Sequence, residues 1–513
     1  MEVGLWAPYA RGARQRATKA DHRCRGRRCV VTAPENELGP IASSYAELQG
    51  LGMLRQAREE SPMGTASSST TLRAILQTVE LTLWNLIDLV DRSTTEARVG
   101  ALGRAVTHWN WIIGFHQVLV TVALTYRRLA LPVSSHEERS VLDLQASPAL
   151  SAYRDALERF DAAILVRERH GQLDIRRSLA SQSLDDNSFR LLHYVRLAAH
   201  QSLIWEELLA SVTISMADRT YEEVVRPALI REAVFERRLK GDTYFTQFRG
   251  LHQVNEILGE EANDHLAEAV HHLQAGQAPP AFEHLRIVNL LLPSMLVALE
   301  VMAFRLSTAD YHHIRENLGL TSGSHSAALH YHLFRDLYHQ LASSLQRLGT
   351  ARFGSDEPHR ATEWVHTVEG KRAADPDAWS LHLVVDGVLE LRTALDHWRQ
   401  LHLHLPRNNL GGPNTTSLTG SPDGLNTVRK LREKAKVHDP LNAVFDQRMG
   451  CAMITSPAPA RLLRDYLASD LSLDRRLLEE TGKVTRERFA KVQERTGIFG
   501  EASPFVPPPR RTV

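Results

Sequence analysis

The sequence predicts an all-α protein, and three observations support that prediction. From Thr71 onward, most segments place apolar residues three and four positions apart, which is the period of a helix with one buried face. No segment alternates apolar and polar residues over a convincing length, as a half-buried strand would. The breaks between the periodic segments coincide with proline and glycine, which interrupt helices.

Each expected helix is a periodic segment between two such breaks. Pro279-Pro280, Gly319 and Glu357-Pro358 mark breaks, and Asp375 before Pro376 fits an N-cap followed by proline at the first helical position. We expect helices at about 72–92, 97–130, 149–170, 188–216, 220–240, 243–275, 281–306, 325–348, 359–373, 378–405 and 426–437, with a weaker charged set near 459–495.

The chain of 513 residues is long enough for two domains. Its start carries scattered arginines, few aliphatic residues and no helical period. Transit peptides are also Arg-rich, but we favour a disordered tail, or translation that begins at Met63. The expected organisation is a tail at 1–70, an N-terminal helical domain at 71–235, a core at 236–440, C-terminal helices at 441–502 and a proline-rich tail at 503–513.

Composition indicates the cellular compartment of the protein and the kinds of partner it lacks. The net charge is +1, so nothing global indicates binding to nucleic acid or to an anionic membrane. Three cysteines cannot build a disulfide framework, which indicates a reducing compartment. The apolar runs are shorter than the roughly 18 residues that a membrane span needs, and no secretory signal is visible. We expect a cytoplasmic protein without a nucleic-acid or membrane partner.

The most informative stretch is 398–429, in which a helix with Trp398 and His402 one turn apart is followed by a Gly/Thr/Ser-rich loop. A histidine held on a rigid helix beside a small-residue loop is what an axial haem ligand requires. His402 ends an inward stripe with steps of three and four residues, formed by Leu381, Val384, Val388, Leu391, Leu395 and Trp398. A core histidine bonded to a neighbour gives the same pattern, so a matching segment is needed elsewhere.

Two other segments supply matching chemistry. Phe248, His252 and Glu256 are one helical turn apart and share a face. Tyr311 and Arg315 are also one turn apart, and their helix gives way at Gly319 to a Thr-Ser-Gly-Ser loop.

Together, the three segments resemble the tryptophan 2,3-dioxygenase family of haem enzymes, over roughly residues 240–435. The family's distal run Phe-x-x-x-His-Gln-x-x-Glu, its aromatic-x-x-x-Arg element followed by Leu and Ser-Gly, and its proximal Trp-x-x-x-His element followed by Leu-Gly, Thr-Gly, a later Gly and an Arg all occur here. The matching residues are Phe248, His252, Gln253 and Glu256; Tyr311, Arg315, Leu318, Ser322 and Gly323; and Trp398, His402, Leu410, Gly411, Thr419, Gly420, Gly424 and Arg429.

The resemblance implies a large helical bundle around a haem b pocket, with an additional N-terminal helical region. It implies that His402 is the axial ligand of the haem iron, with Trp398 and Gly420 beside the cofactor, and that His252 bonds the indole nitrogen or bound oxygen. It also implies that the substrate-binding residues are Phe248, Tyr311, Arg315, Leu318, Ser322 and Thr419.

In this assignment the Arg315 guanidinium binds the carboxylate of an amino-acid substrate, and apolar walls enclose its indole-sized ring. The loop before Thr419 is about three residues longer than in the family, so Thr416 is an alternative to it. Because family members often complete the pocket with a neighbouring subunit, we expect a homo-oligomer.

The functional hypothesis is therefore a tryptophan 2,3-dioxygenase-like oxidoreductase, with an aromatic amino acid and O2 as substrates. Tryptophan or a substituted tryptophan would give an N-formylkynurenine-type product. One alternative is a haem enzyme that rearranges or hydroxylates an aromatic amino acid in secondary metabolism. Another is a helical haem-binding or scaffold protein without turnover.

Other histidines offer competing interpretations. His312-His313, His330-x-His332 and His402-x-His404 lack the spacing of a zinc hydrolase, because such neighbours point to different faces of a helix. His116-Gln117 and His200-Gln201 are rival distal pairs, but neither has Phe four residues before and Glu four after.

Overall fold

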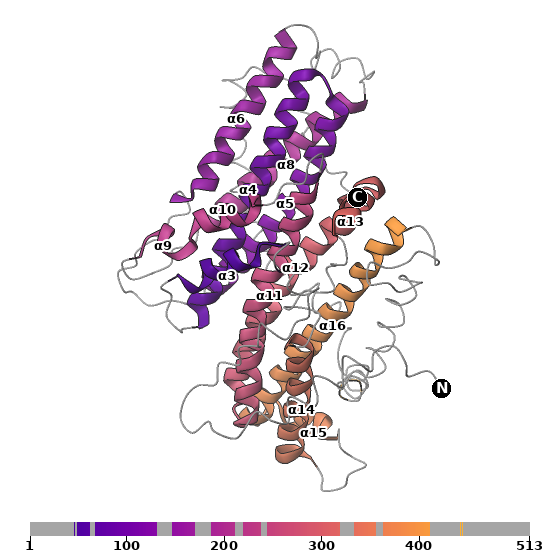
Figure 1. Cartoon of the computed structure of the whole chain (residues 1–513). Helices are drawn as coiled ribbons and strands as arrows, with labels where there is room; N and C mark the ends of the chain where they lie inside the picture. The colour runs from indigo at the N-terminus through magenta and orange to yellow at the C-terminus, as the bar shows by residue number, and fades with distance from the viewer. Residues whose placement is uncertain are drawn as a thin grey trace, which may run out of the picture.

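The computed structural model describes residues 49–61, 67–130, 146–169, 186–210, 219–236, 244–318, 333–354 and 363–410, together with Ala46, Asn442 and Val444. These residues form 13 helices and contain no strand, so the predicted all-α fold is confirmed (Figure 1). The expected helices at 426–437 and 459–495 lie outside the described residues.

The first half of the chain forms a group of long helices. α4 packs against α5 and α6, and α5 packs against α8 (Figure 1). Gly100, with φ of 82°, makes the turn between α4 and α5, in a left-handed conformation that glycine adopts without strain. The bounds are α4 (Ser67–Val99), α5 (Leu102–Ala130), α6 (Pro148–Arg169) and α8 (Asp186–Ala210).

A short helix precedes this group. α3 (Leu51–Glu59) buries Leu51, Leu54 and Ala57. It lies inside the stretch 1–70, for which we expect no helix, so the structure corrects that expectation over residues 51–59. Three apolar residues, each three positions after the last, form one buried face when other helices cover it. Such a short pattern is difficult to recognise as a helix from the sequence alone.

The helix expected at 220–240 is divided in two, which is a second correction. α9 (Tyr221–Val225) begins with a capping box between Thr220 and Glu223, and α10 (Pro227–Phe235) begins at a proline. Arg226 between them has φ of 57°, a conformation that no helix interior contains. Because Pro227 has no N–H to continue α9, the chain starts a new helix there.

The second half is built on an antiparallel pair of long helices, α11 (Phe245–Gln274) and α12 (Ala278–Arg305). Gly276, with φ of 75°, lies in the turn between them. Pro279 and Pro280 fall in the first turn of α12, where a missing N–H has no consequence. The remaining helices are α13 (Thr308–Leu318), α14 (Leu333–Phe353), α15 (Glu363–Lys371) and α16 (Pro376–Leu410).

The N-cap predicted at Asp375 is confirmed. Its Oδ1 accepts hydrogen bonds from the backbone N–H groups of Asp377, at 2.9 Å, and Ala378, at 3.3 Å.

Four helices, α11, α12, α14 and α16, form the part of the protein that contains His252 and His402. α11 and α16 each pack against α12 and against α14. α16 runs parallel to α12, because Asn289 Nδ2 donates to the Gly387 carbonyl at 2.9 Å and the rings of Phe304 and His404 meet further along. α11 runs antiparallel to both. The start of α11 and the end of α16 therefore lie at the same end of the bundle (Figure 1).

α12 is the most apolar helix of the bundle. Within the described residues it is the one helix long and apolar enough to cross a membrane, with a mean hydropathy of 2.0 over its most apolar window. Most of that window, 67%, is buried inside the protein. Its contacts with α5, α11 and α16 account for this composition, because a helix surrounded by helices is apolar all round.

One hydrophobic core runs from α3 to α16. Helices before residue 235 pack on helices after it, α4 on α11 and α5 on α12. The predicted domain boundary at 235–236 stays a prediction, although the two stretches share this core.

Candidate functional site

The segment predicted to be distal lies on α11, whose first turns carry Phe248, His252 and Glu256. All three side chains are buried. The ring centroids of Phe248 and His252 are 4.4 Å apart. The Nδ1 atom of His252 lies 2.9 Å from the carbonyl oxygen of Phe248. A carbonyl only accepts, so Nδ1 is the donor and the lone pair of the neutral ring is on Nε2.

The neighbouring glutamine of this motif points elsewhere. Gln253 Nε2 donates to the carbonyls of Gln49, at 2.7 Å, and Ala233, at 2.9 Å. Arg249, one turn earlier, also donates to the carbonyl groups of Ala233 and Val234 at the end of α10. These two side chains satisfy carbonyls that a helix terminus leaves without partners. Gln253 therefore fixes the position of α11, while His252 faces the bundle.

The segment predicted to be proximal lies on α16, and its predicted inward stripe is confirmed over most of its length. Leu381, Val384, Val388, Leu391 and Leu395 are all buried. Toward the end of the helix, Trp398 and His402 are half-buried. Their rings are stacked, with centroids 5.1 Å apart and planes inclined by 24°. An aromatic ring one turn before thus restrains each of the two histidines.

The surroundings of both histidines disfavour a charged ring. Burial lowers the pKa of His252 to about 4, although the Phe248 carbonyl acts in the opposite direction. Burial, together with a smaller effect of the charge of His252, lowers the pKa of His402 to about 4. The second effect requires the rings, 150 residues apart in sequence, to be within electrostatic reach. Both imidazoles are therefore neutral at pH 7.

The structure describes only some of the other predicted site residues. Tyr311 is half-buried on α13, which packs against α16. Arg315 and Leu318 lie on the same helix, with side chains outside the described part. Ser322, Thr419 and its alternative Thr416, and Gly420 lie outside the described residues. The predicted substrate loop thus stays a prediction.

The rival distal pairs have different surroundings. His116 is fully buried between Trp205, whose Nε1 donates to Nδ1 at 3.0 Å, and the Tyr153 hydroxyl, 2.7 Å from Nε2. The indole N–H only donates, so the ring hydrogen of His116 is on Nε2 and both nitrogens are engaged within the core. His200 is exposed on α8. Neither arrangement faces a second histidine as His252 does.

Several polar clusters were missed by sequence reasoning. Glu80 is buried and accepts hydrogen bonds from Trp84, Ser147 and Tyr221, and burial raises its pKa despite these donors. Arg58 binds carboxylates about 200 residues away. No local spacing indicates such partners. Within the described residues, no group of three or more His, Cys, Asp or Glu side chains is arranged to hold a metal ion.

Fold and site together define an all-helical protein with two neutral histidines, His252 on α11 and His402 on α16. No protein-family model matches the chain, and no curated protein matches it significantly.

Proposed function

We propose that this protein is a haem enzyme that inserts dioxygen into an aromatic amino acid, with tryptophan or a substituted tryptophan as substrate. One observation carries the proposal: His252 on α11 and His402 on α16 each lie one turn after an aromatic ring, and the charge of His252 influences the pKa of His402. The three resembling motifs are distributed over about 180 residues, and the helices that carry the two histidines, α11 and α16, both pack against α12 and α14.

The residues present fit a haem in their donor chemistry. A haem iron takes a neutral imidazole as its axial ligand, and burial keeps His402 neutral at pH 7. The stacked Trp398 ring restrains the orientation of that imidazole. When bound, the haem would supply the iron that activates dioxygen.

The tautomer of His252 favours a role as a hydrogen-bond acceptor toward the substrate. With its hydrogen on Nδ1, held by the Phe248 carbonyl, the ring presents Nε2 as an acceptor. An acceptor pairs with the indole N–H of tryptophan, which donates. His252 would therefore orient the substrate ring, and Phe248 beside it would contribute an apolar wall. The carboxylate of the same substrate would pair with Arg315 on α13.

The test uses purified protein supplied with haem. We expect a Soret band, and anaerobic addition of tryptophan, 7-chlorotryptophan or tyrosine to the ferrous protein should perturb it for the true substrate. Admission of oxygen should then give an N-formylkynurenine-type product. A rearranged or hydroxylated amino acid would favour the alternative chemistry in secondary metabolism, and haem binding without turnover would favour a binding protein. Absence of a Soret band would contradict all three.

A further inference from the structure

α3 lies along α11 beside the turn that follows His252. At its N-terminal side, the Gln49 carbonyl accepts the hydrogen bond from Gln253 on α11. Further along, Leu51 and Leu54 of α3 line one small cavity with Glu256 of α11, with room for about one water molecule. α3 therefore covers α11 at Glu256, one turn after His252.

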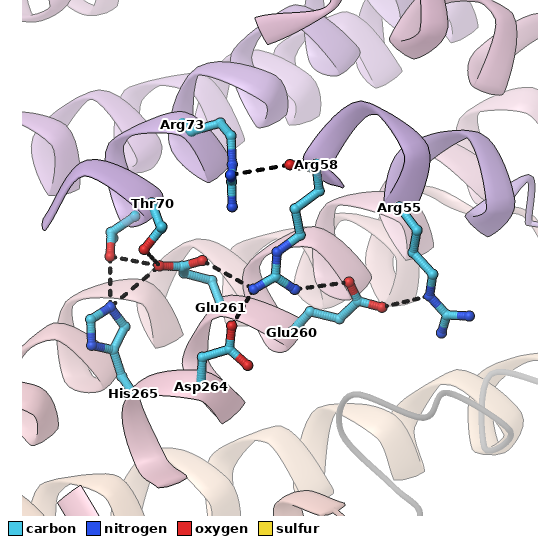
Figure 2. A network of polar contacts seen from close by, with 9 residues as sticks. Arg55, Arg58, Thr70, Arg73, Glu260, Glu261, Asp264 and His265 are labelled. Carbon is cyan, nitrogen blue, oxygen red and sulfur yellow. Dashed lines mark hydrogen bonds and ion pairs between the residues drawn. The ribbon is translucent and has the colours of Figure 1, made fainter. Parts of the chain in front are cut away.

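The other end of α3 is held by ion pairs to the next two turns of α11 (Figure 2). Arg58 lies 3.2 Å from a carboxylate oxygen of Glu260 and 3.5 Å from one of Glu261, and it also binds Asp264. Arg55, one turn earlier on α3, adds a single contact of 3.1 Å to Glu260. Arg58 is thus the side chain on which the contacts of α3 with these carboxylates converge.

Glu261 is the buried member of this network, with 1% of its side chain exposed. Thr70 and Thr71, at the start of α4, donate to its Oε1 at 2.9 and 2.8 Å, and His265 lies 3.3 Å from the same oxygen (Figure 2). Burial acts to raise the pKa of Glu261, but His265 and Arg58 outweigh it and lower that pKa. A buried charge with these partners is sensitive to the loss of any one of them.

The last carbonyls of α3 are held by side chains from other helices. Arg73 Nη1 donates to the Arg58 carbonyl at 3.1 Å, and Gln77 Nε2 donates to the Ala57 carbonyl at 3.2 Å. Arg226, in the junction between α9 and α10, donates to the Glu60 carbonyl at 2.9 Å. These bonds fix the backbone of α3, so the Arg58 guanidinium is presented to α11 from a rigid support.

We infer that Arg58 is a positioning residue for the distal helix. It holds α3 against α11, and α3 in turn covers Glu256 and fixes the turn that carries His252. Only the consequence of this positioning for catalysis rests on the proposed function. The positioning itself is a property of the polypeptide alone.

Hydrogen exchange measured by mass spectrometry on the full-length chain without haem tests the positioning. The variants are Arg58→Gln, Arg58→Lys and, as the matched control, Arg55→Gln on the same helix. Arg58→Gln should speed amide exchange by about tenfold or more in 51–59 and 252–264, because the buried Glu261 loses a charged partner. Exchange in 295–303 of α12 should stay as in the wild type. Arg55→Gln should change little, and Arg58→Lys should restore part of the protection.

Unchanged exchange in Arg58→Gln would overturn the inference. So would an equal rise in 295–303, because a uniform rise means general destabilisation. If Arg58→Gln does not fold, Arg58→Lys decides: it should show a smaller rise confined to the same two segments, and a uniform or absent rise would count against the inference.

A second measurement connects positioning with the proposed site. In haem-loaded ferrous protein, the carbon monoxide stretching band reports on the polar groups near the distal face. Arg58→Gln should broaden or shift that band, whereas Arg55→Gln should leave it as in the wild type; equal bands in both variants would contradict a role in positioning the site. Wild-type protein that binds no haem would contradict the proposed function, and the exchange experiment would still decide the role of Arg58.

Discussion

His116 should make the protein sensitive to acid, and the size of the effect follows from its burial. Burial lowers the pKa of His116 to about 3, against 6.5 for an imidazole in water. As the pH falls below 6.5, the unfolded chain takes up a proton at this residue and the folded protein does not. Stability from this group is therefore complete above pH 6.5 and is lost progressively as the pH falls toward 3. At pH 4.5, two units below 6.5, the loss is about 3 kcal/mol at roughly 1.4 kcal/mol per unit.

The replacement His116→Gln removes this titration and keeps a hydrogen-bonding group between Tyr153 and Trp205. The variant should be less stable than the wild type at pH 7, by about 1–3 kcal/mol, because the amide cannot reproduce both bonds. At pH 4.5 that deficit should shrink by about 3 kcal/mol, or reverse. Urea unfolding at the two pH values measures the difference.

His200→Gln is the control, because His200 is exposed on α8 whereas His116 is fully buried. It should leave the pH dependence of stability as it is in the wild type. An unchanged deficit for His116→Gln between pH 7 and pH 4.5 would refute the assignment of a buried, neutral His116.

Two further predictions concern the distal helix and the substrate. At Gly250 on α11, a Cβ atom would lie 2.5 Å from the buried Asn85 side chain of α4, so Gly250→Ala should destabilise the protein by about 1–3 kcal/mol. Gly52→Ala on α3 meets no atom within 4 Å and should stabilise by up to about 1 kcal/mol; equal effects in urea unfolding would contradict the close approach of α4 and α11. Arg315→Ala should raise the KM of an amino-acid substrate about tenfold or more with a smaller change in kcat, and an unchanged KM would remove Arg315 from the site.

Periodicity predicted the fold well because most helices here are long and bury one continuous stripe. The stripe from Leu381 to Leu395 is an example, and all five of its aliphatic residues are buried. The division at Arg226 was missed, although Pro227 and the Thr220-x-x-Glu223 pattern carry the signal for a new helix. α3 was missed because its buried face has only three residues.

The candidate site was predictable only where it depends on local spacing. Phe248–His252 and Trp398–His402 are i, i+4 pairs, and their ring contacts follow from helix geometry. The nearness of His252 to His402 depends on the parallel run of α12 and α16, which no local pattern specifies. The same holds for Arg58 and Glu261, because an ion pair across about 200 residues depends on how helices pack.

The most direct test of the proposed haem site compares His402→Ala with His404→Ala in ferrous, haem-supplied protein. His404 is two residues along α16 and points to a different face, near Phe304, so it is a matched control. We predict a five-coordinate ferrous spectrum in the wild type and in His404→Ala. In His402→Ala this spectrum should be lost. A spectrum that persists in His402→Ala, or that disappears in His404→Ala instead, would contradict the assignment of His402 as the iron ligand.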